Sequence, residues 1–297
     1  SRLENHFRWS SGQRVCLLAF VGWLQLAAAV AQQPVAKKPP AGPLGKAAPF
    51  YQPDQVQSIY LQVSSANLTK MKTALPERIY VPATFRWHDQ TIENVGVRYK
   101  GNSSSNPNQR HKRSFLVKFS EFEKGRRFLG LERVALDNGI QFGSLFSEPL
   151  ITAILRDLEI KASRCNYARL YLNGRYHGVY VNVERMDNTF TRNHFSAGGA
   201  LYKNHTGGPG GNLGPVPPLA DPNGPRRLAF EPKSSSAYKD ARDVRKLIAR
   251  INKTPDKDFA RVMEATIDMD AFLQTMAVML FSGAFDQLTG WAPHNYY

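Results

Sequence analysis

The side chains of this sequence that could carry chemistry are a small polar loop, two lysines, and a few carboxylate and amide groups. In chain order they are Gly101, Asn102, Ser103, Ser104, Lys112, Lys118, Glu148, Asp286 and Asn295. Phosphoryl transfer from a nucleotide needs a loop over the phosphates, a cation on them and a carboxylate that holds the cation. It also needs an acid to orient the attacking hydroxyl, and an Asn with an Asp for magnesium. The order of these residues therefore indicates a phosphotransferase site.

Each of these residues also fits an ordinary structural role when it is taken alone. A Gly/Ser/Asn loop is most often a plain turn, and Lys118 fits a solvated strand position. Glu148 fits the first turn of a helix, where the helix dipole favours a carboxylate, and Asp286 can cap a loop. The sequence has no P-loop, G-x-S-x-G, H-E-x-x-H or EF-hand pattern, so readings as a P-loop enzyme, esterase, zinc protease or calcium sensor lack support.

The elements that must position these residues change in type along the chain. Alternating apolar and β-branched residues predict strands over 58–63, 79–87, 91–101, 114–119 and 200–204. The stretch 167–184 predicts a hairpin, because Asn173-Gly174 suits a tight turn with positive φ angles. An apolar stripe predicts a helix over 147–159, with Pro149 tolerated in its first turn.

The last third of the sequence is predicted to be helical. Val244, Leu247, Ile248 and Ile251 share one helix face, and a second helix from about 270 to 284 is expected to point its apolar residues inward. Strands before 204 and helices after 239 predict the α+β class, with a sheet-rich first lobe and a helical second lobe. A cleft between such lobes is a natural ligand site.

The N-terminal residues 1–31 carry the features of a cleavable export signal. Three arginines precede the apolar run "VCLLAFVGWLQLAAAVA", which ends in Ala29-Val30-Ala31. The run is shorter than the roughly 20 residues that span a bilayer, and a retained membrane anchor is the alternative. Residues 32–49 are rich in Pro, Ala and Lys and are expected to form an extended linker.

The amino-acid composition indicates which kinds of partner the remaining domain, residues 50–297, is expected to bind. Lys and Arg number 39 against 24 Asp and Glu, so the formal net charge of the chain is +15. This balance suits anionic partners without choosing among them. Of the two cysteines, Cys16 lies in the expected signal, so Cys165 has no partner for a disulfide and is expected to be a buried apolar side chain.

Five segments taken in order resemble the spore-coat-protein-H family (CotH kinases). The segments are "NVGVRYKGNSS", "KRSFLVKF", "LYLNGRYHGVYVNVERMD", "ALYK" and the closing "HNYY". The similarity covers about residues 55–297, and "LNGRYHGVYVNVE" is its most specific part. The family consists of secreted or envelope-associated proteins with an atypical protein-kinase-like fold of two lobes.

The resemblance implies a role for each matching position. Gly101 to Ser104 would be the phosphate-side loop, and either Lys112 or Lys118 would contact the phosphates of ATP. Glu148 would be the carboxylate partner on the helix, and Glu184 would lie near the adenine. Asp286 would be the catalytic Asp and Asn295 a ligand of Mg²⁺ or Mn²⁺.

The sequence departs from the family pattern at its end. Nine positions separate Asp286 from Asn295, whereas kinases place the Asn about five positions after the Asp. The family has a further Asp-containing metal motif shortly after the "HNYY" segment. We therefore expect the chain to stop inside the catalytic centre and the 1–297 fragment to be nearly inactive.

The expected function is that of an exported ATP- and magnesium-dependent kinase. Its substrates would be Ser or Thr residues of envelope, coat or secreted proteins. The first alternative is a non-catalytic surface or coat-assembly module on the same fold. A basic nucleic-acid binder is a further alternative, which the expected export and the lack of an aromatic-plus-basic repeat disfavour.

Overall fold

The computed structural model describes residues 45–101, 105–139, 144–195, 199–204, 211–215, 228–284, 287–289 and 296–297. The expected export signal, 1–31, lies outside the described residues, as does most of the expected linker. Among the described residues, the first regular element is the short 3-10 helix η1 (Pro49–Tyr51).

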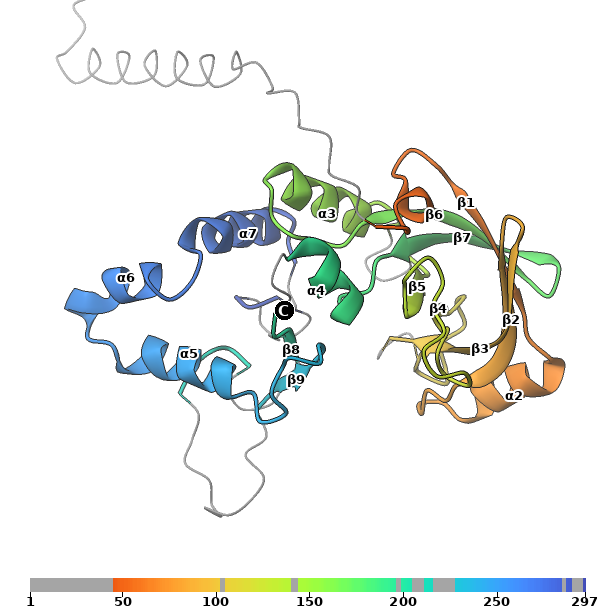
Figure 1. The fold of residues 1–297 in the computed structure, drawn as a ribbon, viewed down its shortest axis with the longest axis horizontal. Helices are drawn as coiled ribbons and strands as arrows, with labels where there is room; N and C mark the ends of the chain where they lie inside the picture. The colour runs from red at the N-terminus through yellow and green to blue at the C-terminus, as the bar shows by residue number, and fades with distance from the viewer. Residues whose placement is uncertain are drawn as a thin grey trace, which may run out of the picture. The chain divides into compact units, whose positions relative to one another are not determined.

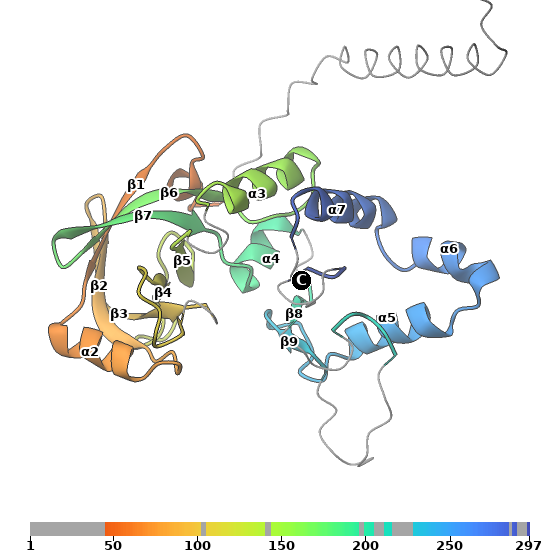
Figure 2. The same cartoon turned by 180° about the vertical axis from the view of Figure 1, so that it is seen from behind.

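Seven strands form a closed barrel (Figure 1 and Figure 2). They are β1 (Gln57–Gln62), β2 (Val81–Trp87), β3 (Gln90–Lys100), β4 (Ser114–Lys118), β5 (Arg133–Asp137), β6 (Cys165–Leu172) and β7 (Arg175–Val183). The order around the barrel is β1-β2-β3-β4-β5-β7-β6. All pairings are antiparallel except the parallel pairing of β1 with β6, which closes the barrel and sets Ile59 opposite Leu170.

Alternation along the strands gives the barrel a closely packed aromatic interior. On β4, Phe115 and Val117 point inward and are at most 1% exposed, whereas Leu116 belongs to a second cluster on the outer side. Phe85, Phe119 and other rings meet edge to face inside the barrel. Every second residue of β3, β4 and β5 therefore points outward, and these outward positions carry the polar site described below.

The predicted hairpin at Asn173-Gly174 is confirmed. Both residues have positive φ, 51° and 77°, and β6 pairs antiparallel with β7 on either side of them. The Asn173 side chain also accepts a hydrogen bond from the Val63 backbone N–H at 2.7 Å and donates one to the Val63 carbonyl at 2.7 Å. The turn residue thus ties the hairpin to the chain that leaves β1.

Helix α3 (Ser147–Asp157) covers part of the outer face of the barrel beside β6 (Figure 1). The hydroxyl of Thr152 lies 3.5 Å from the sulfur of Cys165, at the start of β6. Cys165 is buried and its thiol is free, as the sequence predicts. This packing carries the first turn of α3, and with it Glu148, to the outer side of the barrel.

A second group of elements follows the barrel. It consists of α4 (Asn188–His194), β8 (Tyr202–Asn204), β9 (Phe230–Pro232), α5 (Arg242–Lys253), α6 (Asp256–Glu264) and α7 (Met269–Phe281). Tyr202, Phe230 and Ile248 form a separate small core that joins the β8–β9 pair to α5. The backbone N–H of Asn204 bonds to the Tyr296 carbonyl at 2.9 Å, so the last described residues lie along β8.

The structure confirms the α+β class and corrects two expectations. The sheet closes into a barrel, and it contains β5, which the sequence pattern did not reveal. The inward direction expected for the apolar residues of α7 is wrong for Leu273, Leu280 and Phe281, which are 56%, 61% and 90% exposed, whereas Phe272 and Met276 are partly buried. Helix α2 (Ser65–Thr73), α4 and α6 were also not predicted.

Candidate active site

Three polar residues meet at one rim of the barrel on its outer face. The register of β3 and β4 sets Lys100, the last residue of β3, opposite Ser114, the first residue of β4. The Ser114 hydroxyl bonds to a carboxylate oxygen of Asp137, the last residue of β5, at 3.2 Å. The ammonium group of Lys100 forms an ion pair with the other oxygen of Asp137. The ends of three neighbouring strands therefore hold this pair in place.

Glu148 adds a second carboxylate beside the pair from the first turn of α3. Part of its side chain is exposed, but desolvation raises the pKa of its carboxyl; Lys100 opposes that shift and Asp137 adds to it. Desolvation works against the charge on Lys100 too, yet Asp137 and Glu148 together raise the pKa of the ammonium group. Lys100 thus stays protonated, and its charge stabilises the ionised forms of Asp137 and Glu148.

Two further cations interact with Lys100, one from the chain that follows β7 and one from the second group of elements. Arg185 follows β7, and Lys203 lies on β8. Desolvation and repulsion from Arg185 and Lys100 lower the pKa of Lys203 to about 8. The ammonium group of Lys203 lies 5.7 Å from the ring centre of Tyr297, which itself interacts with Arg185, Lys100 and Glu148. We call Lys100, Asp137, Glu148, Arg185 and Lys203 the rim cluster.

The rim cluster can bind an anion and hold it in a fixed position. Three cations repel one another in this cluster, and after desolvation the repulsion from Arg185 and Lys100 is a further cause of the lowered pKa of Lys203. A phosphate chain would relieve that repulsion, since its oxygens accept bonds from lysine and arginine together. Asp137 holds Lys100 through an ion pair, as a carboxylate holds the phosphate-binding lysine in kinase-type sites.

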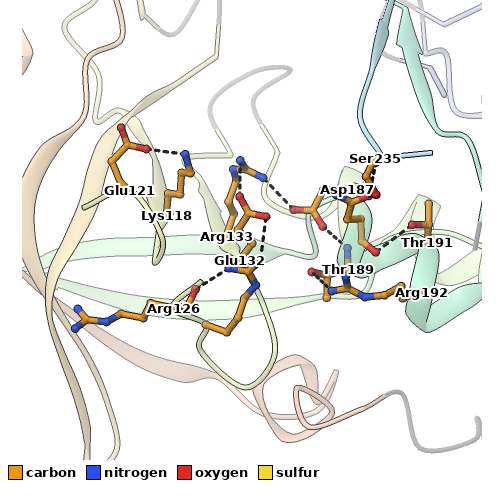
Figure 3. Close-up of polar contacts among 12 residues, drawn as sticks. Lys118, Glu121, Arg126, Glu132, Arg133, Asp187, Thr189, Thr191, Arg192 and Ser235 are labelled. Atoms are coloured by element: carbon orange, nitrogen blue, oxygen red, sulfur yellow. Dashed lines mark hydrogen bonds and ion pairs between the residues drawn. The ribbon is translucent and has the colours of Figure 1, made fainter. Parts of the chain in front are cut away.

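The two lysines singled out in the sequence lie elsewhere. Lys118 is at the opposite end of β4 from Ser114, about 13 Å along the strand at 3.3 Å per residue, and it pairs with Glu121 at 2.7 Å (Figure 3). Lys112 lies near the rim, where its ammonium group bonds to the Val179 carbonyl and lies 4.5 Å from the Tyr180 ring centre. The lysine that faces Glu148 is therefore Lys100 rather than Lys118.

Glu184 is placed in a buried ion pair instead of a nucleotide site. Its side chain is 1% exposed, and its oxygens accept from the Arg164 guanidinium at 2.6 and 2.9 Å and meet a His194 ring nitrogen at 3.1 Å. Desolvation opposes the charge, yet the bonds from His194 and Arg164 hold the pKa of Glu184 below its ordinary value. These partners occupy the carboxylate, so we do not assign Glu184 to the nucleotide.

A polar connection joins the barrel to the second group of elements. Asp187 caps α4 through a 2.8 Å bond to the Thr189 backbone N–H, and its carboxylate lies 3.5 Å from Arg133 on β5 (Figure 3). The next residue, Asn188, accepts a bond from the Ser235 backbone N–H at 2.6 Å. The chain that carries Arg185 is thus fixed on both sides.

Several expected site residues lie outside the described part of the chain. They are Asn102, Ser103, Ser104, Asp286 and Asn295. Gly101 is described: its φ is 97°, which favours glycine, and its carbonyl accepts a bond from Arg78 at 3.2 Å. The roles expected for all six positions stay predictions.

The rim cluster contains residues that sequence reasoning did not select. Lys100 and Lys203 stand in the quoted segments "VRYKG" and "ALYK", and Arg185 stands in "NVERMD", so the signal was present but unassigned. Asp137 ends a strand that was not predicted, and its role became visible only through the pairing of β4 with β5.

The described residues contain neither a cluster of metal-ligating side chains nor a helix that could span a membrane. None of these residues form a group of three or more His, Cys, Asp or Glu side chains that could hold a metal ion. No helix among them is long and apolar enough to cross a bilayer. A magnesium site would therefore need oxygen ligands beyond Asp137 and Glu148, such as Asn295.

Comparison with known proteins points to one family. The model of the family described as CotH kinase protein matches residues 97–297, more than half of the chain and the whole of the rim cluster. A relative, the inner spore coat protein H of Bacillus subtilis (strain 168), is 22% identical over 237 residues. The aligned part is 80% of this chain and 62% of the relative, so the chain spans less than two thirds of that protein's length.

Proposed function

Because the chain belongs to the CotH kinase protein family, we propose that it is an ATP- and Mg²⁺-dependent protein kinase of the cell envelope or the secreted fraction. The proposed acceptors are Ser or Thr residues of envelope, coat or secreted proteins, and Mn²⁺ could replace Mg²⁺. The observation that carries the proposal is the rim cluster, in which Lys100 forms an ion pair with Asp137 and interacts electrostatically with Glu148, Arg185 and Lys203.

In the proposed reaction the rim cluster binds and orients the phosphates of ATP. Lys100, held by the two carboxylates, contacts the phosphate chain, and Arg185 and Lys203 balance its remaining charge. A bound divalent metal would neutralise charge that develops on the transferred group. Asn295 is the proposed ligand of the metal, and Asp286 is proposed to orient the attacking hydroxyl.

A direct assay tests this proposal. The protein made from the complete gene is incubated with ATP labelled at the γ-phosphate, with Mg²⁺ or Mn²⁺, and with an extract of envelope proteins. We expect label on a protein, on the kinase itself or on a component of the extract, and none when the metal is chelated. If no protein is labelled under any of these conditions, the proposed kinase activity is rejected.

The second candidate is a non-catalytic coat-assembly module, which the printed name of the Bacillus subtilis relative favours. This candidate expects no transfer of label but association with other coat or envelope proteins. The labelling experiment therefore separates the two functions.

Affinity for ATP should depend on pH because of Lys203. This lysine has a pKa of about 8, so it is charged below pH 8 and loses its charge as the pH rises through that value. We expect the Kd for ATP to rise by up to about fivefold between pH 8 and 9. The measurement is a titration with a fluorescent ATP analogue, and Lys203→Arg should remove most of the pH dependence because arginine stays charged.

A further inference from the structure

Residues 105–113, the described part of the loop between β3 and β4 beyond Gly101, are organised by one buried side chain. The guanidinium group of Arg113 donates to the carbonyl oxygens of Asn106, Pro107 and Gln109 at 3.0, 3.3 and 3.3 Å. Arg113 is only 8% exposed, although it immediately precedes β4 and bears a full charge. Three carbonyl groups that would otherwise need water thus converge on one cation.

The backbone of the same residue is fixed from the barrel side. The Arg113 carbonyl accepts a bond from the Tyr180 hydroxyl at 3.0 Å, and the Lys112 carbonyl accepts one from the buried Asn138 amide at 2.8 Å. Asn138 in turn donates its backbone N–H to Ser114 at 2.9 Å, and Ser114 bonds to Asp137. A continuous set of bonds therefore runs from the loop to the partner of Lys100.

We propose that Arg113 is a positioning residue, whose guanidinium group holds residues 105–113 of the β3–β4 loop, and through them Ser114 and Asp137, in the conformation in which the rim cluster accepts the phosphates of the nucleotide. The inference rests on the proposed function. Arg113 itself does not face the rim cluster, because its side chain turns into the loop. Its effect on binding is indirect: a loop that is already ordered has less conformational entropy to lose when a nucleotide binds.

The test compares two arginines of the same loop. Arg113→Met removes the three bonds to the carbonyl oxygens, whereas Arg110→Met removes the same charge from an exposed side chain that bonds to none of the described residues. The first readout is hydrogen exchange of the amides of residues 105–112, measured by mass spectrometry. We expect it to be several-fold faster in Arg113→Met and unchanged in Arg110→Met.

The second readout is the steady-state kinetics of phosphate transfer from ATP. We expect Arg113→Met to raise KM for ATP about tenfold while kcat changes little. In this variant the loop is not ordered beforehand, so ATP binding must supply the free energy that orders it. Arg113→Lys keeps the charge but lacks the planar fork, so its exchange and its KM should fall between those of the wild type and Arg113→Met. Melting temperatures identify any variant that fails to fold.

Two results would overturn the inference. One is slow exchange of the loop in a folded Arg113→Met protein. The other is fast exchange with an unchanged KM, which would separate the loop from the nucleotide. If the wild type binds no ATP, the proposed function fails, whereas the exchange data still decide whether Arg113 holds the loop.

Discussion

Replacing Lys100 by methionine should lower phosphate transfer from ATP by about 100- to 1000-fold, the typical loss for one electrostatic contact to a transition state. Lys100 is the cation that Asp137 and Glu148 hold at the rim, and methionine keeps most of the length of the side chain without its charge. The measurement is the initial rate of labelling with γ-labelled ATP, normalised to folded protein.

The same substitution should also disturb the two carboxylates. Without Lys100, Asp137 and Glu148 lie next to each other with less compensation, so Glu148 should take up a proton at a still higher pH. A cost of about 1–3 kcal/mol in the free energy of unfolding is expected from the lost partner. Thermal unfolding of the variant therefore accompanies the rate measurement.

Lys118→Met is the matched control. Lys118 points outward from the barrel like Lys100, but it lies at the far end of β4 and pairs with Glu121. We expect its transfer rate to stay within a few-fold of the wild type. A Lys118 variant as inactive as the Lys100 variant, or a Lys100 variant with full activity, would contradict the assignment of the rim cluster.

Local patterns in the sequence determined which elements could be predicted. The hairpin around Asn173-Gly174 needs only residues that are adjacent in the chain, and it was predicted with nearly correct bounds. Closure of the barrel depends on the parallel pairing of β1 with β6, which are more than 100 residues apart. No periodicity within either strand encodes that pairing, so it could not be derived from one sequence.

The choice of lysine shows the same limit at the site. The resemblance left Lys112 and Lys118 as alternatives, and the sequence could not say which end of β4 lies near α3. Once the register sets Lys100 opposite Ser114, the position next to Glu148 goes to Lys100. The functional residue was inside a recognised segment, and only the pairing of strands identified it.

Helix α7 shows what an apolar stripe leaves undetermined. Leu273, Leu280 and Phe281 lie on one helix face, as the spacing predicts, yet that face is exposed. The spacing of apolar residues predicts which of them share a helix face. Whether that face is buried depends on how the helix packs against the rest of the structure. The bounds of the helix were therefore predictable and its packing was not.

Replacing Glu184 by alanine should destabilise the fold by about 3–5 kcal/mol, because it removes the carboxylate shared by Arg164 and His194. Arg164 is 5% exposed, so water cannot readily replace the lost partner. The melting temperature should fall by about 10 °C, as expected for a domain of this size. Glu121→Ala, which breaks the more exposed pair with Lys118, should cost less than about 1 kcal/mol.

The dependence on pH gives the Glu184 prediction a second test. The pKa of Glu184 in the fold is below its ordinary value of 4.5, so the ion pair stabilises the protein above that pH and is lost as the pH falls through the folded value. The gap in free energy of unfolding between wild type and Glu184→Ala should therefore be widest near pH 7 and close in acid. If Glu184→Ala keeps the wild-type melting temperature but loses affinity for ATP, Glu184 contacts the nucleotide and the structural assignment is wrong.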